Sequence, residues 1–191
     1  MSLKVKGLRE MQKAFDTAAR AMGAAEARAV KRTGTTIIAT QSRGIVETVN
    51  LKVGTVKREL RTVQQPTPTQ PRVVFEVRQR GVPLAEFKGT RQTRKGVSVQ
   101  PLKSGSRSTL QAAFIHNGVV YGRATKGSLV KPRYGSPHVG RTPIVKLFGT
   151  NVLSQYIKDA IQQAGVDTWE KRLPIELDRE TNFALKKAGL L

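Results

Sequence analysis

The residues best suited to chemistry in this chain are its two histidines, His116 and His138. His138 and Arg141 form the HxxR pattern of tyrosine recombinases, and Tyr156 lies downstream. That chemistry needs a further Arg, a Lys and a nucleophilic Tyr in other frames, and a chance HxxR is common among 34 Lys and Arg. His116 precedes Asn117 as in a fragment of an HNH nuclease, but no metal-ligand cluster surrounds it. Because general acid–base catalysis needs a positioned partner, we predict catalysis by neither histidine.

Carboxylates are absent where an active site would need them. Between residues 77 and 158 the single acidic residue is Glu86, which excludes paired-acid hydrolysis and a two-metal centre in that stretch. The chain has no cysteine, no GxxxxGK(S/T) phosphate loop and no GxGxxG motif. Its Ser and Thr residues have no His/Asp setting typical of a triad. We therefore predict a protein that is not an enzyme and uses no metal and no cofactor.

The net charge of +21 is concentrated in the middle of the chain. Residues 1–76 carry 14 Lys and Arg against 6 Asp and Glu, residues 77–158 carry 15 against one, and residues 159–191 carry 5 against 6. A block of like charges repels itself unless a polyanion or an acidic protein neutralises it. The block predicts a surface for nucleic acid or an acidic neighbouring subunit, and the alternative is a solvated basic face.

We expect the contacts with another subunit or with DNA to come from the cations of two polar stretches, residues 88–95 and 124–141, and from the residue that precedes the second. These cations are Lys88, Arg91, Arg94, Lys95, Arg123, Lys126, Lys131, Arg133 and Arg141. The central aromatic residues fall mostly on apolar strand positions, which favours a place in the core over stacking on bases. Contact with DNA would therefore be to the backbone and nonspecific.

Composition and hydropathy limit the size of the fold and the compartment in which the protein works. With 191 residues and 38% hydrophobic residues, the chain can build one domain with a modest core. No stretch approaches the ~18 apolar residues of a membrane span, and the N-terminal residues lack the apolar segment of a signal peptide. We expect no membrane partner and no export by the general pathway, and the absence of cysteine suits a reducing compartment.

Helical periods dominate the first third of the chain. Apolar residues step by three and four through residues 8–30, at Leu8, Met11, Phe15, Ala18, Met22, Ala25 and Ala29. Gly34 weakens this helix, and residues 35–48 can resume it. Asn50 fits the N-cap of a second helix, residues 51–60, and three prolines in residues 64–71 mark a linker or turn.

Strand patterns follow the prolines. We predict strands over residues 72–80 and 96–102, an edge or irregular strand over 83–87, and a polar loop over 88–95. Residues 110–116 and 119–122 predict a hairpin through Asn117-Gly118, and residues 124–141 a long loop. A short helix is expected over 144–148, and an amphipathic one over 151–164 with Gly165 as its C-cap. A last helix extends toward Lys187, kinked or divided by Pro174.

These elements predict an α+β fold, in which N-terminal helices pack on a small antiparallel sheet with long basic loops. The segments are a helical part over residues 1–63, a β core over 72–149 and a helical extension over 150–191, which together form one domain.

Three segments of the β core match a known pattern in order and spacing over about 70 residues. They contain Pro83-Leu84, Phe87, Arg91-Gln92-Thr93 and Gly96-Val97-Ser98-Val99, then Ala113-Phe114-Ile115, then residues 141–149, RTPIVKLFG. In these segments the chain resembles the phage and prophage minor tail protein Z family. It departs from the pattern at Gly89-Thr90 and Thr150-Asn151, and residues 158–191 lie outside the match.

The resemblance implies a non-catalytic virion protein, assembled in the host cytoplasm and located in the tail or neck. Such a tail completion protein would form a homo-oligomeric ring, a hexamer that matches the tail tube. Its partners would be the tail tube and its terminator and the head-connector proteins, and nonspecific contact with genomic DNA in the channel would suit its basic face. Two alternatives stay open: a nonspecific DNA-binding protein in phage genome handling, and a nuclease or recombinase.

Overall fold

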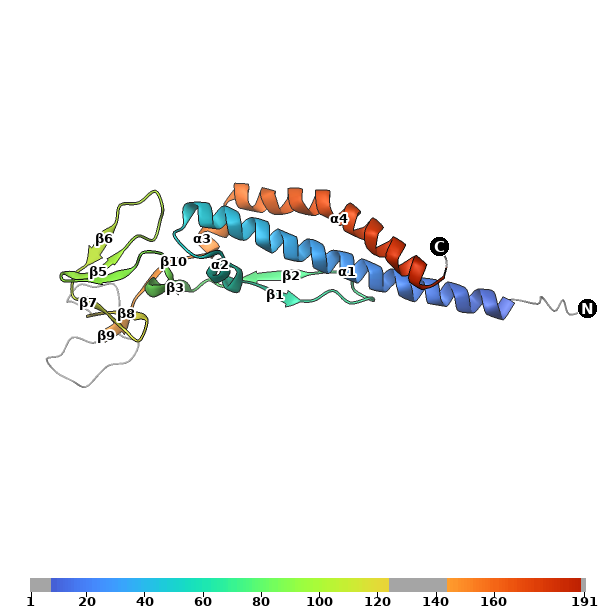
Figure 1. Cartoon of the computed structure of the whole chain (residues 1–191), viewed down its shortest axis with the longest axis horizontal. Helices are drawn as coiled ribbons and strands as arrows, with labels where there is room; N and C mark the ends of the chain where they lie inside the picture. The colour runs from blue at the N-terminus through green and yellow to red at the C-terminus, as the bar shows by residue number, and fades with distance from the viewer. Residues whose placement is uncertain (1–7, 124–143, 190–191) are drawn as a thin grey trace, which may run out of the picture. The chain divides into compact units, whose positions relative to one another are not determined.

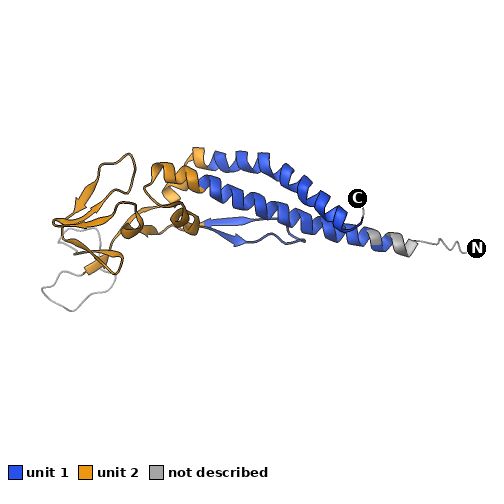
Figure 2. Cartoon of the chain, in the orientation of Figure 1, with its two compact units in different colours: residues 1–41, 61–76, 162–191 blue, residues 42–60, 77–161 orange. Residues whose placement is uncertain are grey.

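The computed structural model describes residues 8–123 and 144–189, and the chain divides into two compact units (Figures 1 and 2). Unit 1 comprises residues 1–41, 61–76 and 162–191, and unit 2 comprises residues 42–60 and 77–161. Helices and small antiparallel sheets together confirm the predicted α+β class. Each unit combines segments that are far apart in the sequence.

Unit 1 is built around helix α1 (Leu8–Thr48), which contributes its residues up to Gln41. Helix α4 (Asp159–Lys187) runs antiparallel along one side of α1 (Figure 1). Strands β1 (Leu60–Gln64) and β2 (Val74–Val77) pair as a two-stranded ribbon, most of which lies in unit 1 against α1. Most of the buried apolar residues of this unit are alanines, namely Ala25, Ala27, Ala29 and Ala184, and Val30 and Ile37 are buried with them.

Helix α1 is continuous, so the expected weakening at Gly34 does not interrupt it. Residues 60–77, which contain β1, β2 and their connection, are called the ribbon segment. A Cβ on Gly34 would lie 3.1 Å from the Phe75 ring and 3.2 Å from Val73, both in this segment. A Cβ on Gly23 would lie 2.8 Å from the carbonyl oxygen of Pro68. Gly23 and Gly34 are eleven residues, or about three turns, apart and so face the same way. Both glycines therefore let the ribbon segment approach the helix closely.

The expected apolar stripe of α1 is buried only in part. Ala25 and Ala29 are fully buried, whereas Phe15 is 68% exposed. The side chains of Leu8 and Met11 lie outside the described part of the chain.

The expected C-cap at Gly165 is wrong, because α4 passes through Gly165 and continues past Pro174 to Lys187 without dividing. A Cβ on Gly165 would lie 2.4 Å from the Nε2 atom of Gln41. The glycine therefore serves close packing of α4 on α1 and does not end a helix. A separate short helix, α3 (Leu153–Tyr156), precedes α4, and the Asn151 side chain accepts a hydrogen bond of 2.9 Å from the Ser154 N–H at its start.

Unit 2 contains most of the strands, two short sheets and a third strand pair, all antiparallel. One sheet has the order β4-β5-β6 and the other β7-β8-β9, while β3 pairs with β10. The bounds are β3 (Gly81–Pro83), β4 (Arg91–Thr93), β5 (Gly96–Val99), β6 (Ser108–Leu110), β7 (Ala113–His116), β8 (Val119–Arg123), β9 (Ile144–Lys146) and β10 (Phe148–Asn151). Helix α2 (Val53–Glu59) and the single turn η1 (Leu84–Glu86) complete the unit with α3 and the end of α1.

The predicted hairpin at Asn117-Gly118 is confirmed. Strand β7 pairs with β8 from Ala113↔Gly122 to His116↔Val119. Asn117 and Gly118 have φ values of 47° and 71°, and a two-residue turn of this kind favours the twist of the flanking strands.

The helix expected over residues 144–148 is wrong. Ile144, Val145 and Lys146 pair with β8, and the Leu147 N–H donates to the Val120 carbonyl at 2.9 Å. β-Branched residues pack well on a pleated surface, and long-range pairing here overrides the helix signal of the proline before them. The loop expected over residues 88–95 also contains a strand, β4. The loop expected over residues 124–141 lies outside the described part of the chain.

Asn50 does not cap a helix, which corrects a further expectation. Helix α2 begins at Val53 with Lys52 before it. The Asn50 side chain instead donates to the carbonyl oxygens of Lys88 at 3.0 Å and Gln100 at 3.1 Å. Asn50 therefore joins two other segments of unit 2.

Gly96 generates a stability prediction. Its φ is +134°, and a Cβ would lie 2.1 Å from the Leu110 carbonyl oxygen in the neighbouring strand. We expect Gly96→Ala to lower the free energy of unfolding by about 3 kcal/mol, because strain and overpacking add. Gly54→Ala is the control, since a Cβ there meets nothing within 4 Å. Urea denaturation of both variants measures the difference, and equal midpoints would contradict the packing role of Gly96.

Candidate interaction surface

Unit 2 holds most of the positive charge. It carries 19 Lys and Arg against 4 Asp and Glu, whereas unit 1 carries 15 against 9. Two of the four acidic residues of unit 2 have partners inside it. Glu86 pairs with Arg58 and accepts a hydrogen bond of 3.0 Å from the Thr55 hydroxyl. Glu59 is 2% exposed and lies 3.5 Å from the nearest guanidinium nitrogen of Arg80.

Most of the remaining cations in the described part of unit 2 are exposed. In the described part of this unit, Arg58 and Arg80 are the basic side chains that form ion pairs with carboxylates. Five residues predicted from the sequence as contact residues are exposed and have no such pair within the described ranges. They are Lys88, Arg91, Arg94, Lys95 and Arg123.

The hairpin of β4 and β5 holds three of these cations. Arg91 lies opposite Ser98 in the pairing, and Arg94 and Lys95 form the turn. The Thr93 hydroxyl donates to the Gly96 carbonyl at 2.8 Å across the turn. The strand pairing and this hydrogen bond hold the backbone that carries Arg91, Arg94 and Lys95.

Gln92 fastens this hairpin to the second sheet. Its side-chain oxygen accepts a hydrogen bond of 2.9 Å from the Ile115 N–H in β7. Its side-chain nitrogen donates to the Gly96 carbonyl at 3.2 Å. The sequence placed Gln92 in a polar loop, and only the register of β7 reveals that it links two sheets.

Lys88 is also held in place through its backbone. Its N–H donates to the Asn50 carbonyl at 2.8 Å, and its carbonyl accepts from the Asn50 side chain. Arg107 donates to the Gly89 carbonyl at 2.7 Å and thus supports the same loop from the other side. The support by Asn50 and Arg107 was not predicted, because both partners are backbone carbonyls more than fifteen residues away.

The structure brings only part of the predicted set together. Arg91, Arg94 and Lys95 share one hairpin and Lys88 precedes it, whereas Arg123 ends β8 in the other sheet, opposite Ile144. Four predicted residues lie outside the described ranges: Lys126, Lys131, Arg133 and Arg141. We call the set Lys88, Arg91, Arg94, Lys95 and Arg123 the basic residues of unit 2.

Lys146 is a cation that sequence reasoning missed. Its Nζ atom lies 5.6 Å from the centroid of the Phe148 ring, and that ring is 51% exposed. Such a cation–π contact leaves an aromatic face and a charge at the surface of unit 2. No sequence signal marked it, since residues 144–148 suggested a helix.

Of the two histidines considered for catalysis, one lies in the ranges that the structure describes. His116 is exposed at the end of β7 and has no side-chain hydrogen bond or ion pair within those ranges, and His138 lies outside them. Residues 8–123 and 144–189 contain no group of three or more His, Asp and Glu that could hold a metal ion. None of the described helices is long and apolar enough to cross a membrane.

The segments that carry the family resemblance pack against one another. Phe148 pairs with Pro83, and the Leu84 N–H donates to the Leu147 carbonyl at 3.2 Å. A Cβ on Gly149 would lie 2.6 Å from the Phe87 ring, so the ring occupies the space that a side chain would need. The first and third segments therefore pack together, while Lys88, Arg91, Arg94 and Lys95 are exposed.

Comparison of the chain with protein-family models, with curated proteins and with solved structures found no match.

The link through Gln92 generates a second prediction. Gln92→Ala removes the acceptor for the Ile115 N–H, which should cost about 1 kcal/mol and speed hydrogen exchange at Ile115. Gln111→Ala is the control, because Gln111 is exposed and its side chain has no hydrogen bond with the described residues. Hydrogen exchange followed by NMR separates the two variants, and unchanged exchange at Ile115 in Gln92→Ala would contradict the link.

Proposed function

We propose that the protein is a non-catalytic structural subunit of a long-tailed phage virion. It acts as a tail completion or neck component that joins the tail tube to the head connector as an oligomeric ring. The observation that carries the proposal is the contact between β3 and η1 on one side and Leu147, Phe148 and Gly149 on the other. Two segments that resemble the family pattern thus pack on each other through Leu84 and Phe87, which are buried, as expected for a scaffold.

The charge of unit 2 supports the same proposal. Its buried or half-buried carboxylates, Glu59 and Glu86, pair with Arg80 and Arg58, and its other exposed cations have no carboxylate partner in the described ranges. A subunit with this surface is stabilised when acidic neighbours or DNA phosphates supply the missing negative charge. We propose the tail tube and its terminator and the head connector as those partners, while neighbouring copies complete the ring.

Charge reversal of the hairpin tests the proposal. We expect Arg91→Glu with Arg94→Glu to reduce the yield of joined particles by about tenfold or more, because like charges across an interface cost several kcal/mol. Electron microscopy should then find separate heads and tails. Lys52→Glu with Lys57→Glu is the matched control, since both residues are exposed cations of unit 2 outside the hairpin. Normal yield from the hairpin variant, with its folding intact by circular dichroism, would count against the proposal.

Mass spectrometry of purified particles is a direct test of location. We expect the chain to be present in finished particles. Its absence from them would reject the structural role and leave the alternative below.

The alternative function is nonspecific DNA binding in phage genome handling, and the unpaired cations of unit 2 favour it. It predicts that the isolated protein retards a 30-base-pair duplex at low salt. If the five basic residues of unit 2 contact phosphates, affinity should fall about 100-fold or more between about 50 and 200 mM salt. An absence of retardation at low salt would remove this alternative.

A further inference from the structure

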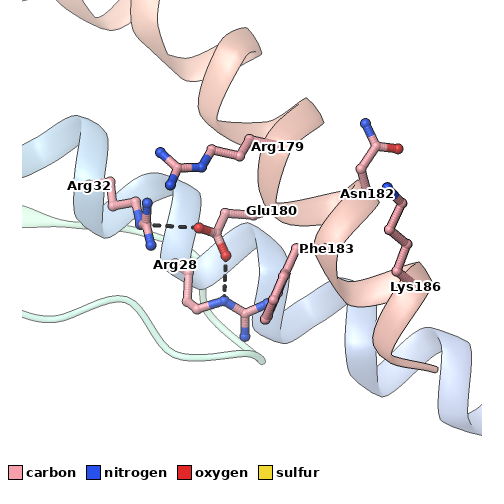
Figure 3. Close-up of a pocket in the computed structure, with 7 residues that line it drawn as sticks. All are labelled: Arg28, Arg32, Arg179, Glu180, Asn182, Phe183 and Lys186. Carbon is pink, nitrogen blue, oxygen red and sulfur yellow. Dashed lines mark hydrogen bonds and ion pairs between the residues drawn. The ribbon is translucent and has the colours of Figure 1, made fainter.

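A hollow between α1 and α4 of unit 1 is lined mainly by cations (Figure 3). Its volume is about 460 Å³. The lining includes Arg28, Arg32, Arg179, Glu180, Phe183 and Lys186. None of these residues belongs to the surface described for unit 2.

Two further hollows adjoin it on the same helix pair. One, of about 290 Å³, shares Arg28 and Phe183 and is lined by alanines: Ala21, Ala24, Ala184 and Ala188. The other, of about 450 Å³, shares Arg28 and Arg32 and reaches Thr36. The three hollows extend along α1 from Thr17 to Thr36, which is roughly 28 Å at 1.5 Å per residue. We call them together the Arg28 groove.

One carboxylate in the Arg28 groove is shared by two arginines. Glu180 is 4% exposed and binds the Nε atoms of Arg28 at 2.6 Å and Arg32 at 3.1 Å. Because Arg28 uses its Nε, its two terminal nitrogens have no carboxylate partner within the described ranges. Guanidinium groups prefer carboxylates that they can bind with two donors. The groove therefore offers unused donors for an incoming carboxylate.

Two more cations at the groove are unpaired. Arg179 and Lys186 are exposed and form no ion pair with any residue that the structure describes. Figure 3 shows both on α4, with Phe183 between them along the helix. The three hollows together are lined by two carboxylates, Glu176 and Glu180, and by six cations: Arg28, Lys31, Arg32, Arg179, Lys186 and Lys187. The groove therefore has a positive excess.

The groove also exposes apolar surface. Phe183 is 59% exposed, and the guanidinium carbon of Arg28 lies 6.0 Å from the centroid of its ring. Next to Phe183 the alanine-lined hollow leaves room because both helices carry small side chains there. A large apolar side chain from outside could cover the ring and enter this hollow.

We propose that the Arg28 groove binds an acidic amphipathic helix of a partner protein. Carboxylates of that helix would pair with Arg28, Arg179 and Lys186, and its apolar face would cover Phe183 and the alanines. A third helix is a common occupant of the groove between two antiparallel helices, where it is anchored by side chains three and four residues apart. The inference goes beyond the proposed function and does not rest on it, because the groove lies in unit 1.

Charge and shape disfavour the other occupants. A second copy of the chain carries the same net charge of +21 and would be repelled from a positive groove. A DNA duplex would engage the cations through its phosphates but would not fill a hollow lined by alanines. Both occupants are outcomes of the test below.

The test uses the full chain and a fluorescent peptide. The probe is a capped helical peptide of about 18 residues, long enough for the groove at 1.5 Å per residue, with leucines on one face and glutamates beside them. We expect it to bind in an anisotropy titration at low salt. A second peptide with every glutamate replaced by glutamine should bind at least about tenfold more weakly, since charge-assisted pairs are lost.

Paired variants locate the binding. Phe183→Ala with Arg179→Glu should weaken binding of the acidic peptide about tenfold or more, because central aromatic and arginine residues dominate such interfaces. Ile175→Ala with Lys171→Glu makes the same chemical changes at exposed positions of α4 that line none of the three hollows, and should change affinity by less than about twofold. All four residues are exposed, so folding should persist, and circular dichroism checks this.

Four results would overturn the inference. Two concern the peptide: equal binding of the two peptides, and equal weakening by the two paired variants. Two concern other occupants: displacement of the peptide by a 30-base-pair duplex whose own binding needs Phe183, and a dimer of the chain that Phe183→Ala with Arg179→Glu dissociates. Arg91→Glu with Arg94→Glu should leave peptide binding unchanged. Failure of the proposed function and failure of this inference are therefore distinguishable.

Discussion

Carboxylates are the scarce component of this protein, and the structure depends on where they are placed. The chain has 13 of them for 34 Lys and Arg. Glu180 ties α4 to two arginines of α1, and Glu86 ties η1 to α2 through Arg58 and Thr55. A carboxylate that is buried or half-buried in a contact between two segments does not neutralise cations elsewhere on the surface. Most exposed cations consequently have no carboxylate partner among the residues that the structure describes, and they add to the self-repulsion of the protein.

Close approach of other segments to glycines is the second feature shared by both units. Gly23 and Gly34 admit the ribbon segment to α1, and Gly165 admits α4. In unit 2, Gly149 makes room for the ring of Phe87. At each site the missing Cβ is replaced by an atom of another segment, so the stability lost through a glycine's freedom is offset by close contact. In unit 1, alanines on both helices likewise leave the hollow beside Phe183.

The sequence predicted the features that depend on neighbours along the chain. The α+β class, the helix over residues 8–30 and the Asn117-Gly118 hairpin follow from periodicity and turn geometry. Predictions failed where a distant segment competes for the same residues. Ile144 and Val145 pair with β8, and Asn50 bonds to the carbonyls of Lys88 and Gln100. In both cases a long-range contact outweighed a local preference.

The positive midsection could be read from the sequence, because charges add along a chain whatever its fold. The same holds for the exposed placement of Lys88, Arg91, Arg94 and Lys95, since a polar stretch rarely enters a core. The sequence could not show which cations form ion pairs with carboxylates. Arg28 and Glu180 are 152 residues apart, and their meeting depends on the packing of two helices. The groove beside them exists because that packing leaves one flank of the helix pair uncovered among the described residues.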